Sequence, residues 1–228
     1  MKPILIALLL SFLLPFATFA DETVTIGQTA IQVPLPAGFA RFDGVNADVD
    51  KLMNSLVPPT NRMLLIVATP DDVKAAKAGT PGNMKRYMLV QTFKDGEAQT
   101  VTVKQFAEVL TALETQFATK DKGAGNLESE VNNLLKGAKL PTDLKIGETS
   151  MLGVFEKNER AIDIGMLSKV QIGQEAPSPL AAAASIMLVH GKVSYLYVYS
   201  EYHDTEDVAW ARRTVKAWRE AILAANPE

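Results

Sequence analysis

The sequence predicts an α/β fold of the α+β type: an α/β/α sandwich around a largely antiparallel sheet of about six to eight strands, with a long C-terminal helix. Three observations lead to this prediction. Short apolar or alternating runs recur along the chain with turn residues between them, which is typical of consecutive antiparallel strands. Residues 101–117 and 206–225 carry apolar side chains at helical spacing along one side. Residues 192–203 predict a strand with large side chains on both faces, so helices are expected on each side of the sheet.

The first part of the chain predicts a hairpin, a helix and a buried strand. Residues 22–33 alternate apolar and polar side chains around Gly27-Gln28, the signal of a two-residue hairpin turn. Residues 45–57 can form a short helix, which ends at two prolines. Residues 63–69 (MLLIVAT) are apolar almost throughout and predict a strand covered on both faces.

Helices and strands alternate in the middle of the chain. Pro70 and two aspartates open a short helix, a glycine-containing turn follows, and residues 86–93 predict the next strand. After the amphipathic helix at 101–117, the polar residues 119–126 are the most linker-like segment of the chain. We interpret them as a long loop inside a single α/β domain over 21–228, with two small α+β lobes joined there as the alternative.

The C-terminal part predicts a further helix and then an antiparallel meander. The helix is expected at 127–135 and a proline-bearing loop at 174–180. Turns are expected at Asn158-Glu159 and at His190-Gly191, where glycine supplies a positive φ. The alanines at 181–184 have helical propensity, so the start of the third strand is left open. The four strands are expected at 150–157, 160–170, 184–189 and 192–200.

The first twenty residues have the pattern of a secretory signal peptide. Lys2 precedes a largely apolar run over 4–19, and small residues stand before the expected cut at Asp21. An uncleaved anchor is the alternative, because the run approaches the roughly 20 residues that span a bilayer. Pro15 favours cleavage. We therefore expect bacterial export of residues 21–228 to the periplasm or the medium.

Composition narrows the function further. The chain has no cysteine, which excludes disulfides, lipid attachment through cysteine and thiolate chemistry. Its 23 basic and 26 acidic side chains give a formal net charge of −3 with no basic tract, so a nucleic-acid partner is not expected. Beyond residue 20 the longest apolar run, 180–189, is too short to cross a membrane, and no transmembrane segment is expected after cleavage.

The strand at 192–203 contains the main candidate binding face. Tyr195, Tyr197, Tyr199, Glu201 and His203 fall on one face of that strand. Tyrosines pack well in sheets with their hydroxyls reaching water or a carbonyl, which explains them without a ligand. The alternative is a groove that accepts an apolar or aromatic ligand.

The acidic residues after this strand predict a helix cap. Asp204 is placed as the N-cap of the last helix, with Asp207 as its partner in a capping box. A metal site would need convergent ligands, and His190 lies at the opposite end of the strand from His203. We therefore assign no metal ligand and no cofactor-binding residue.

The last helix has an apolar side and a basic side. The apolar stripe is expected to pack inward; it consists of Val208, Ala211, Val215, Trp218 and Ile222. Four basic residues lie on or near the outer side: Arg212, Arg213, Lys216 and Arg219. They are explained as a solvated surface, with a docking face for an acidic partner as the alternative.

Several catalytic signatures are missing from the sequence. There is no nucleophile elbow, no phosphate-binding P-loop and no dinucleotide-binding glycine motif after a strand. Neither histidine has a recognisable triad motif around it. A pair of carboxylates for hydrolysis stays open, because the distance between them is not visible in sequence. No catalytic residue is assigned.

Three segments together suggest a family. They are VPLPAGF, VTVKQFAEVLTALETQF and IMLVHGKVSYLYVYSEYHDTEDVAWARRTVKAWREAIL. This pattern resembles the PsbP-like fold of extrinsic photosystem and bacterial envelope proteins, and the chain is also similar to bacterial exported proteins of unknown function. The resemblance implies an α/β/α sandwich with an accessory or binding role, and it brings no cofactor residues with it.

The sequence thus favours an exported, non-enzymatic accessory or binding protein whose partner is an envelope protein or a small ligand. Two alternatives stay open. One is a hydrolase with a carboxylate-based site, and the other is a carrier that holds an apolar or aromatic ligand on the tyrosine side of the strand.

Overall fold

The computed structural model describes residues 21–80, 82–118, 144–172 and 176–228. The predicted signal peptide (1–20), linker (119–126) and second helix (127–135) lie outside the described residues, as does the start of the predicted loop at 174–180. The prediction of a single cooperative domain over 21–228 stays a prediction, which limited proteolysis of these residues would test.

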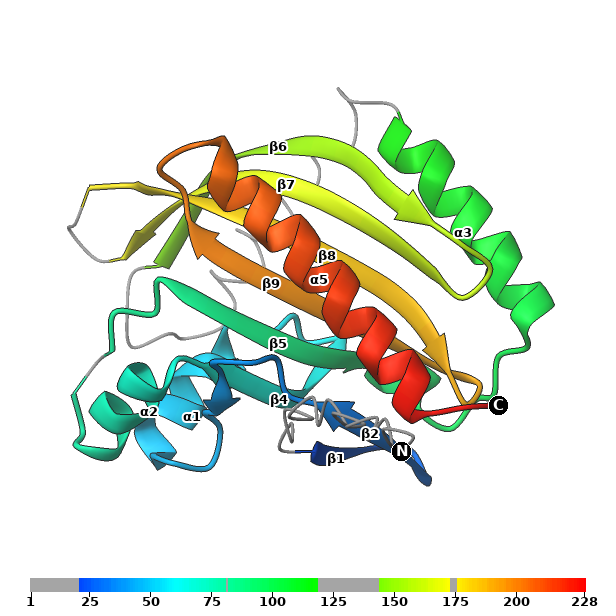
Figure 1. Ribbon diagram of the computed structural model, residues 1–228, viewed down its shortest axis with the longest axis horizontal. Coiled ribbons are helices and arrows are strands. Elements are labelled where there is room, and N and C mark those ends of the chain that lie inside the picture. Colours follow the sequence, from blue (N-terminus) through cyan, green and yellow to red (C-terminus); the bar gives the residue numbers. More distant parts are fainter. Residues whose placement is uncertain (1–20, 81, 119–143, 173–175) are drawn as a thin grey trace, which may run out of the picture.

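Nine strands are present in the described residues. They are β1 (Asp21–Ile26), β2 (Thr29–Pro34), β3 (Ala40–Arg41), β4 (Asn61–Ala68), β5 (Arg86–Phe93), β6 (Leu144–Lys157), β7 (Ala161–Ile172), β8 (Ser178–Val189) and β9 (Lys192–Glu201). Strands β1 and β2 form a hairpin, and the other seven form one sheet in the order β3-β4-β5-β9-β8-β7-β6 (Figure 1). Every pairing in this sheet is antiparallel, as the sequence predicts.

The helices cover both faces of the sheet. They are α1 (Ala47–Ser55), α2 (Pro70–Lys77), the short 3₁₀ helix η1 (Lys94–Gly96), α3 (Val103–Ala118) and α5 (Thr205–Ala225). The buried side of α5 packs against Ala161 of β7, whereas α3 packs against the next residue, Ile162. Since neighbouring residues of a strand point to opposite faces, α5 and α3 lie on opposite sides of the sheet. The predicted α/β/α sandwich is confirmed, and Figure 1 looks onto its α5 side.

Helices α1 and α2 lie on the α3 side of the sheet. Their cluster contains Ile66 of β4 and Leu89 of β5, while the α5 cluster takes Val67 and Val90 from the same two strands. The β1–β2 hairpin contributes its apolar side chains to the α5 cluster. One face of the sheet is therefore covered by α5 and the hairpin, and the other by α1, α2 and α3.

The C-terminus of α5 holds the hairpin in place. The side-chain amide of Asn226 accepts from the Gln32 N–H (2.9 Å) and donates to the Gln32 carbonyl (2.7 Å). The indole Nε1 of Trp218 donates to the Pro34 carbonyl at 2.8 Å. These bonds satisfy backbone groups on the outer edge of β2 that have no strand beside them.

Two strands of the meander are longer than predicted. Strand β6 begins at Leu144 instead of residue 150, and β8 begins at Ser178, so the predicted loop at 174–180 is wrong for its last three residues. The alanines at 181–184 belong to β8 despite their helical propensity. They are buried between β7 and β9, and pairing on both edges outweighs the local preference of about 0.5–1 kcal/mol per residue.

The predicted tight turns at Gly27-Gln28 and His190-Gly191 are confirmed. Gly27 has a φ of +60° in the β1–β2 turn, and His190 and Gly191 have φ values of +48° and +72° between β8 and β9. Two consecutive positive φ values are the signature of the primed turn that suits a twisted hairpin.

Candidate binding face

The tyrosines of β9 share one face of the sheet, as their spacing predicts. Burial alternates along the whole strand: Leu196 and Val198 are fully buried beneath α5, while Tyr195, Tyr197 and Tyr199 are only partly buried on the other side. The same strand therefore separates a sealed face from one that remains partly exposed.

A fourth tyrosine joins this row from β5. Tyr87 pairs with Tyr199 across the β5–β9 ladder, and their rings stack with centroids 4.8 Å apart and an angle of 17° between planes. The Tyr197 ring lies 6.1 Å from that of Tyr199 at the same angle. We call the sheet face that carries Tyr87, Tyr195, Tyr197 and Tyr199 the tyrosine face. Sequence reasoning missed Tyr87, because only the pairing of β5 with β9 brings it here.

Tyr197 sits at the centre of the tyrosine face and joins two apolar clusters. It packs against the cluster under α1 and α2 and also against the cluster under α3. Methionines lie around both clusters as partly buried residues: Met53, Met63, Met84, Met151 and Met166. The tyrosine face is thus an aromatic row with flexible thioether side chains on either side.

Met84 reaches this face from a backbone conformation that few side chains adopt. Its φ is +45°. Its N–H donates to Asp72 Oδ1 at 3.0 Å, and the hydroxyl of Thr69 donates to Asp72 Oδ2 at 2.6 Å. The buried carboxylate of Asp72 at the start of α2 therefore fixes a strained residue at the rim of the tyrosine face.

The phenols of the tyrosine face stay neutral. Burial raises the pKa of Tyr87 to about 12, and it raises the pKa values of Tyr195, Tyr197 and Tyr199 above the usual 10. A neutral phenol can donate or accept a hydrogen bond while its ring makes apolar contacts. The row suits a ligand or protein surface that is apolar with a few polar groups.

Glu201 and His203 do not extend the tyrosine stack. Glu201 ends β9 with its carboxylate 3.7 Å from Lys85 Nζ. His203 follows the end of the strand, and its Nδ1 lies 3.4 Å from Asp207 Oδ2. Of the five residues predicted to share one face, the three tyrosines lie on the sheet, Glu201 ends β9, and His203 lies just before α5.

The predicted cap of α5 is confirmed. Asp204 accepts from the Glu206 N–H at 2.8 Å and forms a capping box with Asp207. Asp207 Oδ2 also accepts from the backbone N–H of His203, the main reason why its pKa falls to about 2. Within the described residues, no group of three or more histidine and carboxylate side chains is placed to hold a metal ion.

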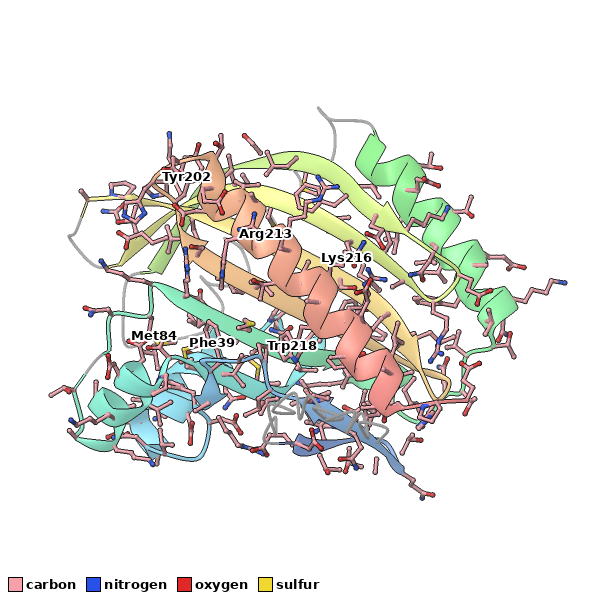
Figure 2. The ribbon with its side chains drawn as sticks, viewed as in Figure 1. Phe39, Met84, Tyr202, Arg213, Lys216 and Trp218 are labelled. Carbon is pink, nitrogen blue, oxygen red and sulfur yellow. The ribbon has the colours of Figure 1, made fainter. Side chains whose placement is uncertain are left out.

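The basic residues of α5 are largely engaged within the chain. Arg212 stacks over the Phe155 ring at 5.0 Å. Arg213 pairs with Glu206, and Lys216 pairs with Glu156 of β6 at 2.7 Å. Figure 2 labels Arg213 and Lys216 along the outer side of α5. These contacts within the chain already neutralise part of the positive charge on the outer side of α5.

Arg219 does not belong to this outer surface. The prediction that it lies on or near the outer side of α5 is wrong, since the residue is only 1% exposed. It follows Trp218 and lies four residues after Val215, both of which are buried, so the helical repeat turns it toward the sheet. There its guanidinium lies 3.1 Å from Asp163 of β7.

Carboxylates converge around arginines at two places in the described residues. Glu22 and Asp43 both contact Arg41, and Glu156 and Asp163 both contact Arg219. In each place the guanidinium holds the two carboxylates together.

The comparisons with known proteins concern the fold. No protein-family model and no curated protein match this chain. A similar solved structure is the solution structure of cyanobacterial PsbP (CyanoP) from Synechocystis sp. PCC 6803, with a TM-score of 0.39 and 11% identity over 92% of this chain and 94% of that one. A similarity this low transfers no role to this chain. No helix of the described part is long and apolar enough to cross a membrane.

Proposed function

We propose that this chain is an exported accessory protein that acts by binding, and that the tyrosine face is its binding surface. The observation that carries the proposal is the unequal cover of the two sheet faces by the residues that the structure describes. Among these residues, the apolar cluster on the α5 side has twenty buried residues and four partly buried ones. On the tyrosine face, each of the two clusters has six buried residues and nine partly buried ones within the same described part.

When a partner covers partly buried apolar side chains, the free energy of the complex falls, because their remaining apolar surface is removed from water. Each square ångström of apolar surface removed from water contributes about 25 cal/mol. Tyrosine and methionine are common at binding surfaces, because tyrosine offers a large rigid ring and methionine adapts its shape to different partners. Both kinds of residue are gathered on the tyrosine face.

An envelope pull-down tests whether the tyrosine face binds a protein partner. The mature wild type is compared with a Tyr195→Ala/Tyr197→Ala variant and with an Arg212→Ala/Arg213→Ala control on the opposite side. We expect the tyrosine variant to lose a partner that the wild type and the arginine control retain, by about tenfold or more. A partner lost from the arginine control and retained by the tyrosine variant would disprove the proposal. The melting temperature of each variant verifies folding.

A small-ligand carrier is the second candidate, and the near-parallel stack of Tyr87, Tyr199 and Tyr197 favours it. Planar or apolar molecules stack on such rings. Native mass spectrometry of protein isolated from its own envelope would then show an added small-molecule mass that the tyrosine variant lacks. The absence of this mass, with a protein partner captured, would leave the accessory role alone.

Export is supported by the signal-like residues 1–20. We expect the purified envelope protein to begin at or within about two residues of Asp21. Mass spectrometry of the N-terminus measures this. A product that retains Met1 in the membrane fraction would contradict export with cleavage.

A further inference from the structure

A cavity of about 340 Å³ lies where α1 ends and β4 begins. Its walls come from the last turn of α1, the segment 57–59, the first residues of β4 and Lys94 of η1. None of the four tyrosines of the tyrosine face lines it. Small-molecule sites in proteins usually have volumes of about 300–1,000 Å³. The cavity is therefore a candidate ligand site separate from the tyrosine face.

The chain's own hydrogen bonds hold the walls of this cavity in place. The Asn61 N–H donates to the Pro58 carbonyl at 2.8 Å, and the Lys94 N–H donates to the Thr60 carbonyl at 2.9 Å. Pro58 and Pro59 also have φ angles that their rings restrict. A site formed before the ligand arrives loses little conformational entropy on binding.

Hydrogen-bond acceptors at the end of α1 are already used within the chain. The carbonyls of Met53 and Asn54 accept from backbone N–H groups just after the helix. The Ser55 hydroxyl donates to the Leu52 carbonyl at 2.6 Å. These contacts weaken the negative potential that the C-terminal end of a helix places on its surroundings.

Two cationic side chains line the cavity, and none of its described lining residues is acidic. Arg62 is held by Glu97 through Nε at 2.7 Å and Nη2 at 2.8 Å, which balances its charge. Lys94 Nζ donates to the Pro59 carbonyl at 2.8 Å, and it pairs with no carboxylate in the described part of the chain. Since an ammonium has three N–H donors, Lys94 keeps donors and a positive charge for a ligand.

We propose that this cavity binds a small organic acid, whose carboxylate accepts hydrogen bonds from Lys94 Nζ. The apolar body of the ligand packs against Val57, Pro58, Pro59 and Met63, which also line the cavity. An inorganic anion would lose water against this wall without apolar contacts in return, so the wall favours an organic acid.

Titration with benzoate at constant ionic strength, followed by ¹H–¹⁵N NMR, tests the ligand class. We expect saturable shifts of the backbone amides of residues 54–57, 61–63 and 94. Benzamide has the same ring without the charge, and inorganic phosphate has the charge without the ring. Each should bind at least about tenfold more weakly than benzoate. Equal affinity for benzamide or phosphate, or no saturable benzoate shift up to about 20 mM, would overturn the proposal.

A lysine variant tests the position of the carboxylate. Lys94→Gln should lower the affinity for benzoate by about tenfold, because one charge-assisted hydrogen bond is lost. Lys94 is exposed, so the variant should fold. Lys74→Gln, at an exposed lysine of α2 outside the cavity, is the matched control and should retain the wild-type affinity. Unchanged benzoate affinity in Lys94→Gln would disprove the site.

The tyrosine variant separates this site from the tyrosine face. Tyr195→Ala/Tyr197→Ala should bind benzoate as tightly as the wild type does, whatever becomes of its protein partner. Loss of benzoate binding in that variant would place the ligand on the tyrosine face and overturn the assignment to this cavity.

Discussion

In the part of the chain that the structure describes, the two faces of the central strand β9 differ in how completely they are covered. Beneath α5, Leu196 and Val198 are sealed from water, and the C-terminal helix adds Trp218 and the buried Arg219. On the opposite side, Tyr197 and Tyr199 are partly exposed between two separate helical covers. One face therefore contributes most of the stability, and the other has apolar area left for a partner. A substitution on each face should separate these roles.

The largest expected loss of stability follows the removal of a buried side chain on the α5 face. Trp218→Ala removes an indole that is 2% exposed and its bond to Pro34, and should lower the free energy of unfolding by about 3–5 kcal/mol. Urea unfolding measures this. Tyr195→Ala, from the partly buried tyrosine face, should cost only about 1 kcal/mol. Equal losses for the two variants would remove the distinction between the faces.

Breaking the buried ion pair should cost nearly as much. Arg219→Met keeps the length of the side chain and leaves Asp163 buried without its charge partner, for an expected loss of about 3 kcal/mol. Adding Asp163→Asn should restore part of that loss, because it removes the unpaired charge. A double-mutant cycle in urea measures the coupling. A loss below about 0.5 kcal/mol in Arg219→Met would show that the pair does not hold α5 to the sheet.

Acid should weaken the start of α5 through Asp207. Its pKa is lowered to about 2 in the folded protein from 3.8, mainly by the His203 N–H. A lowered pKa stabilises the fold above about pH 4, and this contribution of about 2 kcal/mol disappears as the pH falls toward 2. The free energy of unfolding is measured between about pH 6 and about pH 2, a range chosen from these two pKa values. Over this range Asp207→Asn should lose less of it than the wild type does. If the free energy of unfolding fell with pH at the same slope in the wild type and in Asp207→Asn, the pH dependence would not come from Asp207.

The cap itself should have a smaller effect. Asp204→Ala should cost about 0.5–2 kcal/mol and Asp204→Asn much less, since asparagine also caps helices. Thermal melting compares the two variants. Added zinc, nickel or manganese should leave the wild-type melting temperature unchanged. A rise with metal that disappears in both His203→Ala and Asp204→Asn would replace the cap with a metal site.

Local patterns were sufficient to predict most of the fold. The alternation in β9, the turn at His190-Gly191 and the cap at Asp204 depend on neighbouring residues, and all three are confirmed. The early start of β8 was not predictable from its alanines, because partners on both edges decide their conformation. Helical propensity was a poor guide there.

The candidate site was predictable only in part. Spacing placed three tyrosines on one face, but Tyr87 joins them through a strand pairing between distant segments. Arg219 was assigned to the surface because charged residues are mostly exposed, and its buried partner Asp163 is 56 positions away in the sequence. Long-range pairing decided both outcomes.

Site-specific photo-crosslinking tests the role of the tyrosine face most directly. p-Benzoylphenylalanine replaces Tyr195 in one protein and Arg213, on the outer side of α5, in a second. Both variants are produced in the native host and irradiated in intact cells. We expect position 195 to form a defined crosslinked product, to a protein or to a small molecule, and position 213 to form little or none. Crosslinks to the same product in equal yield from both positions, or only from position 213, would contradict a binding role for the tyrosine face.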